Sequence, residues 1–583
     1  MFKKYFPILV WIKHYTYDDF ASDTVAAIVV TIMLIPQSLA YALLAGLPPQ
    51  IGLYASIIPL LIYSVFGTSN TLAVGPVAVI ALMTFAVCSK FAQPGSSEFV
   101  SIAILLAAIS GLILLLMGIL RLGFITNFLS HPVISGFITA SGLIIAASQF
   151  KHILGINGDG SNLITILSSI LKNISEISIV TLFIGILSLF ILYWSKKRFK
   201  SFLINSNVNE FLSDLISRTG PIIAVIVSTF FVWIFGLGDN AVSIVGHIPK
   251  GLPEIKFPEI TLNAFFELFI PALLISIVGY VETVSIAQTL AAKRREKIEH
   301  NQELIALGLS NFGSGLSGGF PVTGGFARSV VNFDAGAKTP AAGAFTAIGI
   351  AFSTLFLTSL LFYLPKATLA ATIIIAVLSL VDFKSVIKVF SYSKTDGLAM
   401  VSTIVVTLCF GVEIGIVSGV VLSLIMFLYR TSKPHIAKVG QVPGTEHYRN
   451  EDRHIVISSN TVICLRIDES LYFPNARFLE DTIYKFIINN KNAKHIIIMC
   501  SAVNYIDSSA LESLEFVNSR LNEAGVKLHL SEVKGPVMDQ LKKTNFLDEL
   551  TGEVFLTNFQ AFLKLEPKLA NKTLKLKNAR NLN

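Results

Sequence analysis

The sequence predicts an α-helical protein that crosses a membrane many times and carries a water-soluble α/β domain near its C-terminal end. Hydrophobic residues make up 53% of the 583 residues and charged residues only 14%, whereas soluble proteins are roughly 25% charged. The mean hydropathy is +0.69. Charge is also uneven, because the last 143 residues hold 18 Lys and Arg and 17 Asp and Glu, about twice the density of the rest. A long membrane domain followed by a compact soluble domain is therefore expected.

A bilayer core needs about 20 apolar residues in each crossing helix. Basic clusters lie before the first apolar segment and after the sixth, eighth and fourteenth, at 196–200, 293–297 and 430–438. This even-numbered spacing places both termini in the cytosol under the positive-inside rule, and the N-terminus is too polar for a signal peptide. We expect a multi-pass protein of the cytoplasmic membrane. The fourteen segments lie at 24–44, 50–66, 75–92, 99–120, 124–149, 175–195, 220–236, 265–291, 301–318, 323–335, 340–362, 367–381, 396–410 and 412–429.

The pattern changes after Lys438. The stretches HIVIS, TVICLRI, KHIIIMC and VKLHLS read as strands, and a helix begins at Asn475 and another at Ser508, the second closed by Gly525. Strands that alternate with helices predict an α/β layer domain. The expected parts are a cytosolic segment at 1–23, a transmembrane domain at 24–430, a linker at 431–444, a soluble domain at 445–566 and a basic tail at 567–583.

Several functional classes are unfavourable. The four cysteines show neither metal-ligand nor disulfide spacing, which fits a reducing cytosol. The net charge of +8 is modest and no basic stripe alternates with aromatic residues, so nucleic acid is not an expected partner. No nucleotide-binding loop or nucleophile–base pairing is evident. We therefore expect neither an enzyme nor a bound cofactor or metal.

Two of the short segments look alike and lie seven segments apart. One opens with Val74-Gly75-Pro76 and the other with the run 320–325, so both place Gly and Pro just before a half-length apolar helix. Broken helices at matching positions of two inverted halves indicate the substrate site of a transporter. Gly and Pro are also frequent in transmembrane helices in general, which is the alternative interpretation.

An anion that has left water needs hydrogen-bond donors in its place. Two half-helices that meet at their N-termini supply unpaired backbone N–H groups and the positive ends of two dipoles. This predicts an anion site formed by Val77, Ala78, Phe326, Ala327 and Arg328.

Arg328 adds a full charge and a planar fork of donors that can hold two oxygens of one oxyanion. An arginine at membrane depth is costly and therefore functional by default. The alternative is a purely structural salt bridge, for which Asp334 is a candidate partner.

The motifs resemble those of the SulP sulfate permeases, the family that includes prestin. AYALLAGLPPQIGLYASIIPLLIYSVFGTSNTLAVGPVAV (40–79) resembles the family signature and NQELIALGLSNFGSGLSGGFPVTGGFARSVVNF (301–333) its second motif. IDSSALESLEF (506–516) resembles the DSS loop of STAS domains. The resemblance implies seven-plus-seven inverted repeats divided into core and gate, an elevator-like motion and a homodimer.

The resemblance also bears on individual residues. It places a substrate-facing arginine at Arg328. Many relatives carry serine hydroxyls here in a GSFSRS-like pattern, whereas this chain reads Gly325-Phe326-Ala327-Arg328-Ser329. Two possible side-chain donors are therefore missing, which weakens any transfer of substrate identity. Gln37 and Tyr41 lie four residues apart on one helix face and match substrate-facing positions. From spacing alone they could equally be a polar packing pair.

Glu282 lies in the apolar eighth segment, where the resemblance implies a coupling-ion site. Low polarity favours a protonated carboxyl, so a proton is the expected coupling ion. Sodium is the alternative, with Thr283 or Ser285 as further ligands, and pairing with Arg328 is the structural alternative.

The sequence therefore predicts a secondary anion transporter, with proton-coupled sulfate uptake as the leading hypothesis. Sodium-coupled transport of bicarbonate, chloride or dicarboxylate is the alternative within the class. A membrane anion sensor that signals to a cytosolic partner through its STAS domain is the alternative outside it. Ser508 and Ser509 are candidate regulatory residues, because a serine of this loop is phosphorylated in related anti-sigma antagonists.

Overall fold

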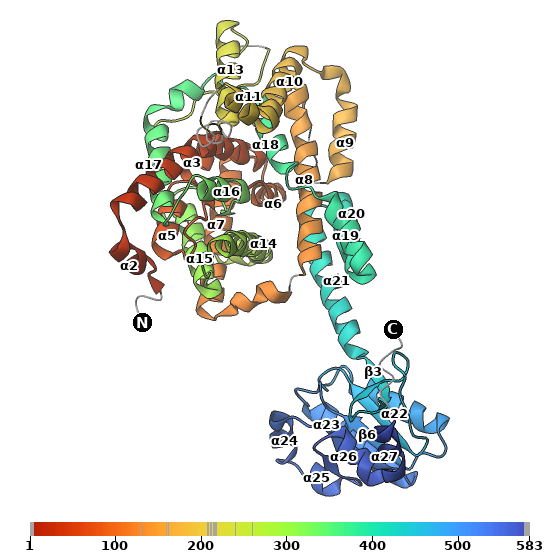
Figure 1. Ribbon diagram of the computed structural model, residues 1–583. Helices are drawn as coiled ribbons and strands as arrows, with labels where there is room; N and C mark the ends of the chain where they lie inside the picture. The colour runs from red at the N-terminus through yellow and green to blue at the C-terminus, as the bar shows by residue number, and fades with distance from the viewer. Residues whose placement is uncertain are drawn as a thin grey trace. The chain divides into compact units, whose positions relative to one another are not determined.

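The computed structural model describes residues 5–128, 130–158, 160, 162–206, 209, 213, 219–238, 241–258 and 261–576. The chain divides into two compact units, Met1–Ser423 and Leu424–Asn583 (Figure 1). We describe each unit by itself.

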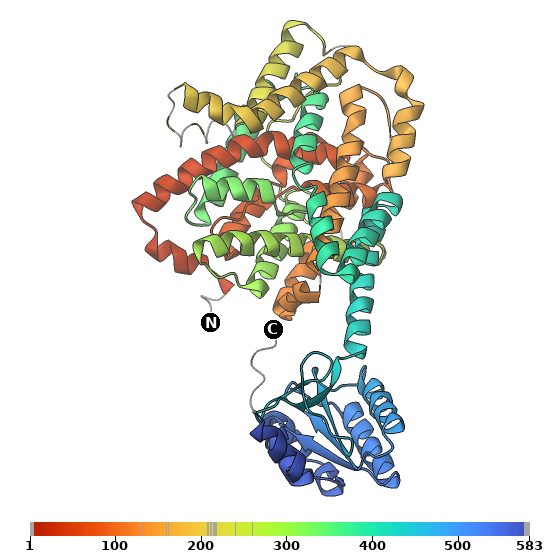
Figure 2. The ribbon, with the colours of Figure 1, turned by 45° about the vertical axis from the view of Figure 1, so that its right-hand side comes forward.

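Unit 1 is a bundle of helices (Figure 2). Its described residues also form a two-stranded sheet. Unit 1 ends within its last helix, α21 (Val412–Ser432). Its helices are α2 (Ile8–Trp11), η1 (Ile12–His14), α3 (Tyr17–Leu44), α4 (Pro49–Tyr54), α5 (Ile58–Phe66), α6 (Ala78–Cys88), α7 (Ser97–Ile119), η2 (Leu122–Phe128), α8 (His131–Leu154), α9 (Leu163–Lys172), η3 (Ile174–Glu176), α10 (Ile179–Trp194), η4 (Ser195–Phe199), α11 (Lys200–Asn205), α13 (Gly220–Ile234), α14 (Leu262–Arg294), α15 (His300–Leu316), α16 (Phe326–Asp334), α17 (Ala341–Phe356), η5 (Thr358–Leu361), α18 (Lys366–Val377), α19 (Phe383–Tyr392), α20 (Lys394–Phe410) and α21 (Val412–Ser432).

Each of the fourteen apolar segments expected from the sequence contains a helix. Among the described residues, seven helical segments are long and apolar enough to cross a bilayer. Five further apolar helices have 10 to 17 residues, among them α6 and α18. The number of crossings therefore stays a prediction, because the shorter helices span the bilayer only together with their neighbours. The seven longer segments are Tyr17–Leu44, Pro49–Phe66, Ser97–Ile119, His131–Leu154, Ile179–Asn205, Leu262–Arg294 and Val412–Ser432.

Glycines let two of the central helices approach closely. A Cβ on Gly111 of α7 would lie 2.4 Å from the backbone N of Phe312, and one on Gly308 of α15 would lie 2.6 Å from that of Leu115. Small residues at such contacts bring helix backbones together, which favours packing inside a membrane. The backbones of α7 and α15 are therefore in close contact.

The two-stranded sheet consists of β1 (Val74–Gly75) and β2 (Thr323–Gly324), which pair antiparallel. Val74 lies opposite Gly324 and Gly75 opposite Thr323. Each strand leads directly into a short helix, β1 into α6 and β2 into α16. The two interrupted segments singled out from the sequence are therefore in contact.

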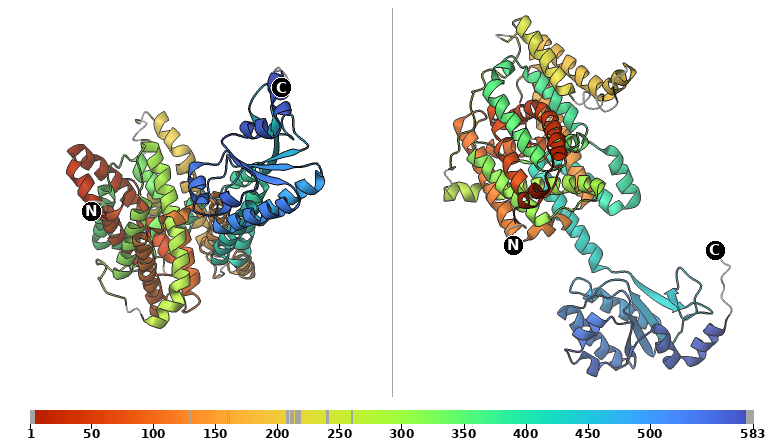
Figure 3. Two further views of the ribbon diagram at one scale, coloured as in Figure 1. Left: turned by 90° about the horizontal axis from the view of Figure 1, so that it is seen from below. Right: turned by 60° about the vertical axis from the view of Figure 1, so that its left-hand side comes forward.

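Unit 2 is an α/β domain built on a six-stranded sheet in the order β4-β3-β5-β6-β7-β8 (Figure 3). Strands β5 to β8 are parallel, and β3 is antiparallel to both of its neighbours. One face of the sheet packs on α22, α23 and α24 and the other on α26 and α27. The elements are β3 (Ile436–Gln441), β4 (Tyr448–Asn450), β5 (Val462–Ile467), α22 (Ala476–Asn489), β6 (His495–Met499), α23 (Ser508–Glu523), β7 (Lys527–Ser531), α24 (Gly535–Leu541), α25 (Phe546–Glu549), β8 (Val554–Phe555), α26 (Asn558–Leu565) and α27 (Pro567–Lys575).

Unit 2 differs from the sequence expectations at three places. The HIVIS stretch at 454–458 contributes only an isolated bridge between Ile457 and Gln441 rather than a strand. Strand β3 lies inside the range 431–444 expected to be a linker, because its pairing with β5 extends the sheet. Helix α27 begins the expected tail, and its Ala570 is fully buried against the sheet.

Two histidines in unit 2 have a defined tautomer. The backbone N–H of Glu553 donates to Nδ1 of His529, so a neutral His529 carries its proton on Nε2. That Nε2 lies 3.1 Å from Nδ1 of His495 and donates to it. Burial, followed by the neighbouring His495, lowers the pKa of His529 to about 4.

We expect unit 2 to lose stability in acid between about pH 6.5 and about pH 4. In this range the unfolded chain binds a proton at His529 that the folded domain does not bind, so the free energy of unfolding falls as the pH falls. Above pH about 6.5 this contribution is constant. Hydrogen exchange of β7 and β8 in the intact protein, corrected for intrinsic rates, measures the change.

The matched variant is His529→Asn, whose side-chain oxygen can still accept from the N–H of Glu553. It should flatten the pH dependence in this window. An equally steep dependence in the variant would assign the acid sensitivity to other groups.

Candidate functional site

The site is built where β1 and β2 end and two helices begin. The N-caps are Val77 for α6 and Gly325 for α16, and neither supplies a side-chain hydrogen bond to its helix. Because no side chain caps these helices, their first-turn N–H groups remain as donors. The N–H of Gly325 donates to the carbonyl of Ala73 at 3.1 Å and the N–H of Ala73 to Ser329 Oγ at 3.0 Å, which fixes the two helix starts together.

A cavity of about 50 Å³ lies at these helix starts. This is several times the volume that one water molecule requires. Every substrate-binding residue predicted from the sequence lines it, together with Glu282; the seven are Gln37, Tyr41, Val77, Ala78, Phe326, Ala327 and Arg328. Residues from α3, α6, α14 and α16 thus meet at one place. Phe326, 46% exposed, forms part of the rim.

Arg328 is 2% exposed, and its guanidinium lies between the two broken segments. Nε donates to the carbonyl of Ala73 at 2.7 Å, Nη1 to that of Pro76 at 2.6 Å and Nη2 to that of Thr323 at 2.8 Å. Arg328 forms no ion pair with any described residue, so the structure does not contain the Arg328–Asp334 salt bridge that the sequence left as an alternative. The guanidinium therefore holds β1 and β2 together, keeps its full charge at the cavity and retains two N–H groups for a ligand.

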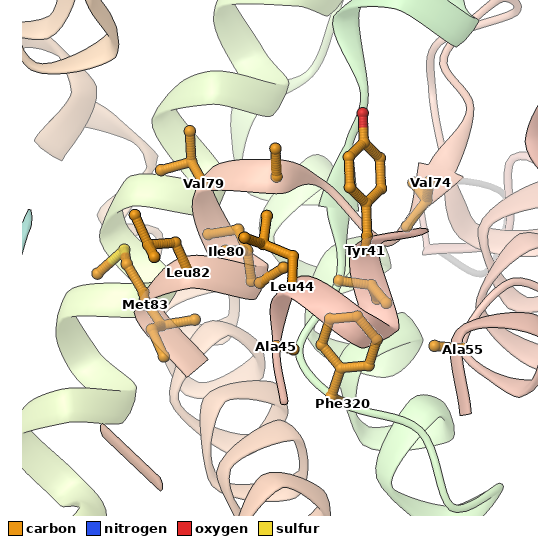
Figure 4. Close-up of a cluster of buried hydrophobic side chains, with 14 of the residues drawn as sticks. Tyr41, Leu44, Ala45, Ala55, Val74, Val79, Ile80, Leu82, Met83 and Phe320 are labelled. Atoms are coloured by element: carbon orange, nitrogen blue, oxygen red, sulfur yellow. The ribbon is translucent and has the colours of Figure 1, made fainter. Parts of the chain in front are cut away.

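Gln37 and Tyr41 face the cavity from α3. Both are buried, with exposures of 7% and 8%. In the part of the chain that the structure describes, neither side chain forms a hydrogen bond, so the amide and the phenol remain able to donate to a ligand. Tyr41 also belongs to a cluster of buried apolar side chains that includes Leu44 of α3 and Leu82 of α6 (Figure 4).

Glu282 reaches the cavity from the middle of α14. Its carboxylate forms no hydrogen bond or ion pair with any described residue, Arg328 included. A second cavity of about 20 Å³, lined otherwise by apolar residues of α6, α8, α14 and α21 such as Phe137 and Ile416, lies on its other side. Glu282 thus lies between a polar cavity and an apolar one.

The opposite wall of the cavity comes from the end of α18, a region to which the sequence argument assigned no role. Ala376, Val377, Ser379 and Leu380 contribute it. Only Ser379 has a polar side chain, and its hydroxyl donates to the carbonyl of Ala376 at 2.5 Å. No local pattern identifies these residues, because their position depends on how α18 packs in three dimensions.

The candidate regulatory residues lie in unit 2. Ser508 and Ser509 are exposed in the first turn of α23. The N-cap is Asp507, which accepts from the backbone N–H groups of Ala510 and Phe473, both at 2.8 Å. Both hydroxyls are therefore accessible, and the cap does not depend on them.

Comparisons with protein families identify both parts of the chain. Residues 20–403 match the sulfate permease family and residues 454–561 match the STAS domain. The chain is 36% identical to "Probable sulfate transporter 4.2" of Arabidopsis thaliana, covering 94% of this chain and 82% of the relative. It is 32% identical to "High affinity sulfate transporter 2" of Stylosanthes hamata, covering 97% and 87%.

Solved structures match the fold. SLC26A9 superimposes with a TM-score of 0.88 at 23% identity, covering 98% of this chain and 94% of that one. The transmembrane domain of the cyanobacterial bicarbonate transporter BicA gives 0.60 at 21% identity, covering 70% and 98%. These matches confirm the predicted resemblance and fold class, a helical membrane fold followed by an α/β STAS domain.

Proposed function

Because the chain belongs to the sulfate permease family, a family of transporters and not of enzymes, we propose that it is a secondary active transporter that takes up sulfate together with protons. One observation carries the proposal: two uncapped helix N-termini and Arg328 meet at one buried cavity. Backbone N–H groups, helix dipoles and a guanidinium are the donors that a desolvated oxyanion requires. Gln37 and Tyr41 complete the set.

Sulfate as the substrate is supported by the relatives, which are named sulfate transporters at 31% to 36% identity over nearly the whole chain. Sulfate carries two charges and four acceptor oxygens, and the cavity offers donors from several directions. The two free N–H groups of Arg328 and the backbone groups of α6 and α16 are the proposed ligands.

The proton is supported as the coupling ion by Glu282, which is the only carboxylate among the residues that line the cavity. Glu282 has no hydrogen-bond or ion-pair partner among the described residues, and only the charge of Arg328 on the same cavity favours its ionised form. An ionised carboxylate there would be costly, and binding a proton removes the charge. Glu282 is close enough to the anion cavity for its charge to act on the anion.

An elevator-like motion is supported by the unequal walls of the cavity. The α6, α14 and α16 side is held together by buried hydrogen bonds through Ala73, Thr323 and Arg328, whereas the α18 side is mostly apolar. Apolar surfaces can slide past one another without breaking hydrogen bonds, so the first group of elements would move as one body that carries the anion. We place the protein in the cytoplasmic membrane, with both termini in the cytosol.

A homodimer is the proposed assembly, with unit 2 supplying much of the contact. Several large apolar side chains of this water-facing domain are exposed, among them Phe473 at 71%, Ile488 at 73% and Leu556 at 78%. These exposed side chains are candidates for the contact in the proposed dimer.

We expect a chain truncated after Ser432 to be largely monomeric in detergent, while the full chain forms dimers. The deletion of residues 433–583 includes β3 and therefore removes the whole sheet of unit 2. Mass photometry of both forms at equal concentration measures the change. A truncated chain that stays dimeric would mean that membrane helices form the interface.

The transport proposal is tested with the purified protein in liposomes. Uptake of radiolabelled sulfate is measured under an imposed inward proton gradient, an imposed sodium gradient and no gradient, with bicarbonate, chloride and dicarboxylates as competitors. Accumulation driven by protons and displaced by unlabelled sulfate is the expected result. Accumulation driven only by sodium, or inhibition by bicarbonate but not by sulfate, would replace the proposed coupling ion or substrate.

A further inference from the structure

Two buried threonines join the helix that carries Glu282 to the strand that leads to Arg328. Thr283 on α14 is fully buried, and Thr323 on β2 is 1% exposed. Their hydroxyl oxygens are 2.7 Å apart. The contact therefore links the two elements that carry the proposed ion and anion sites.

The hydrogen bonds in this contact run in one direction. Thr323 Oγ1 donates to the carbonyl of Gly279 at 2.6 Å. Because a carbonyl only accepts, the hydroxyl proton of Thr283 is left to be donated to Thr323. Thr283 Oγ1 in turn accepts from the backbone N–H of Gly324 at 2.9 Å. The chain leads from the backbone of β2 through both hydroxyls to the backbone of α14, with every donor paired.

Two glycines allow this close contact. A Cβ on Gly279 would lie 3.2 Å from Thr323 Oγ1, and one on Gly324 would lie 3.0 Å from Thr283 Oγ1. Helix and strand are thus as close as their backbones permit. A shift of this turn of α14 must either move β2 with it or break the hydrogen bonds.

Thr323 also contacts the anion site directly. Its carbonyl accepts from Nη2 of Arg328 at 2.8 Å, while its hydroxyl is bound to α14. Glu282, the neighbour of Thr283 in sequence, and Arg328 line the same cavity. Thr283 and Thr323 connect the backbones that carry them by a second, hydrogen-bonded path.

We propose that Thr283 and Thr323 are positioning residues that transmit the protonation state of Glu282 to the anion site at Arg328. The inference rests on the proposed function, in which Glu282 takes up the coupling proton. A change of charge on Glu282 displaces the surrounding turn of α14, and the hydroxyl chain moves β2 and the guanidinium with it. Such coupling requires a physical element that both sites act on, and it must be reciprocal: protonation that tightens anion binding is itself favoured by the anion.

The test compares sulfate affinity of the purified full chain at about pH 6 and about pH 8, together with proton-driven accumulation in liposomes. We expect the wild type to bind roughly tenfold more tightly at the lower pH, within the usual range of coupling between sites. Thr283→Val keeps the shape of the side chain but removes both hydrogen bonds. It should reduce the ratio between the affinities at about pH 6 and about pH 8 to less than about twofold and abolish accumulation, while sulfate exchange persists. Thr283→Ser, which keeps the hydroxyl, should restore the ratio.

A merely structural role for Thr283 would weaken binding at both pH values equally and leave the ratio unchanged, which would overturn the inference. Thr323→Val provides a second variant, because it leaves the bond between Gly324 and Thr283 intact and should also lose the ratio. Glu282→Gln separates the two hypotheses. If Glu282→Gln abolishes the pH dependence of sulfate affinity but Thr283→Val leaves it unchanged, the threonine inference alone fails. If the wild type binds sulfate equally well at both pH values, or if Glu282→Gln still binds more tightly at the lower pH, the proposed function fails and the inference with it.

Discussion

Arg328→Ala is expected to abolish detectable sulfate binding, with a loss of affinity of about 100-fold or more, corresponding to about 3 kcal/mol. The substitution removes the one cationic side chain among the residues that line the cavity, together with two N–H groups that have no partner in the described part of the chain. It also leaves the carbonyls of Ala73, Pro76 and Thr323 without their donor. Binding is measured by calorimetry or radioligand filtration, and folding by thermal unfolding of the same samples.

The loss of three carbonyl partners could by itself distort the site, so two controls are needed. Arg328→Lys keeps the charge but cannot donate to all three carbonyls in the plane of a guanidinium. Arg294→Ala provides the matched control: Arg294 also donates to backbone carbonyls, those of Ala337 and Phe333, but it does not line the cavity. Unchanged affinity in Arg328→Ala would remove Arg328 from the site. Equal losses in Arg328→Ala and Arg294→Ala would make its role structural.

The general architecture could be read from the sequence because its signals are local. Apolar runs, their lengths and the basic clusters between them predict helices that cross a membrane, and each of the fourteen runs does contain a helix. The meeting of the two interrupted segments could also be predicted, since Gly and Pro interrupt both at matching positions, but their antiparallel pairing as β1 and β2 was not predicted. In unit 2 the buried strand β6 stood out as a continuous apolar run, which is typical of parallel strands covered on both faces, and β5 and β7 as short runs rich in aliphatic residues.

What the sequence did not reveal depends on packing. The wall formed by Val377 and Leu380 has no pattern of its own, and these residues reach the cavity only through the position of α18. The three carbonyls that accept from Arg328 are backbone atoms, which no side-chain motif records. Strand β3 was missed because its sequence, IAKVGQ, is not a continuous apolar run and begins only four residues after the end of the long helix α21.

Glu282→Gln is expected to abolish proton-driven accumulation of sulfate while exchange of sulfate across the membrane continues. The carboxylate lies between the polar cavity and an apolar one and has no hydrogen-bond or ion-pair partner among the described residues. Glutamine has nearly the same shape and fixes the neutral state, so the proposed carrier can still bind and move the anion but no longer takes up and releases a proton.

We expect accumulation to fall by at least about tenfold and exchange to change by less than about threefold, since the substitution removes a free-energy coupling and not the anion ligands. Both rates are measured side by side in liposomes that contain the same amount of protein. Glu267→Gln is the matched control, because Glu267 lies on the same helix but is exposed near its start and does not line the cavity. It should behave as the wild type. Proton-driven accumulation that survives in Glu282→Gln would exclude Glu282 as the coupling residue, whereas selective loss of sodium-driven uptake would reassign the coupling ion to sodium.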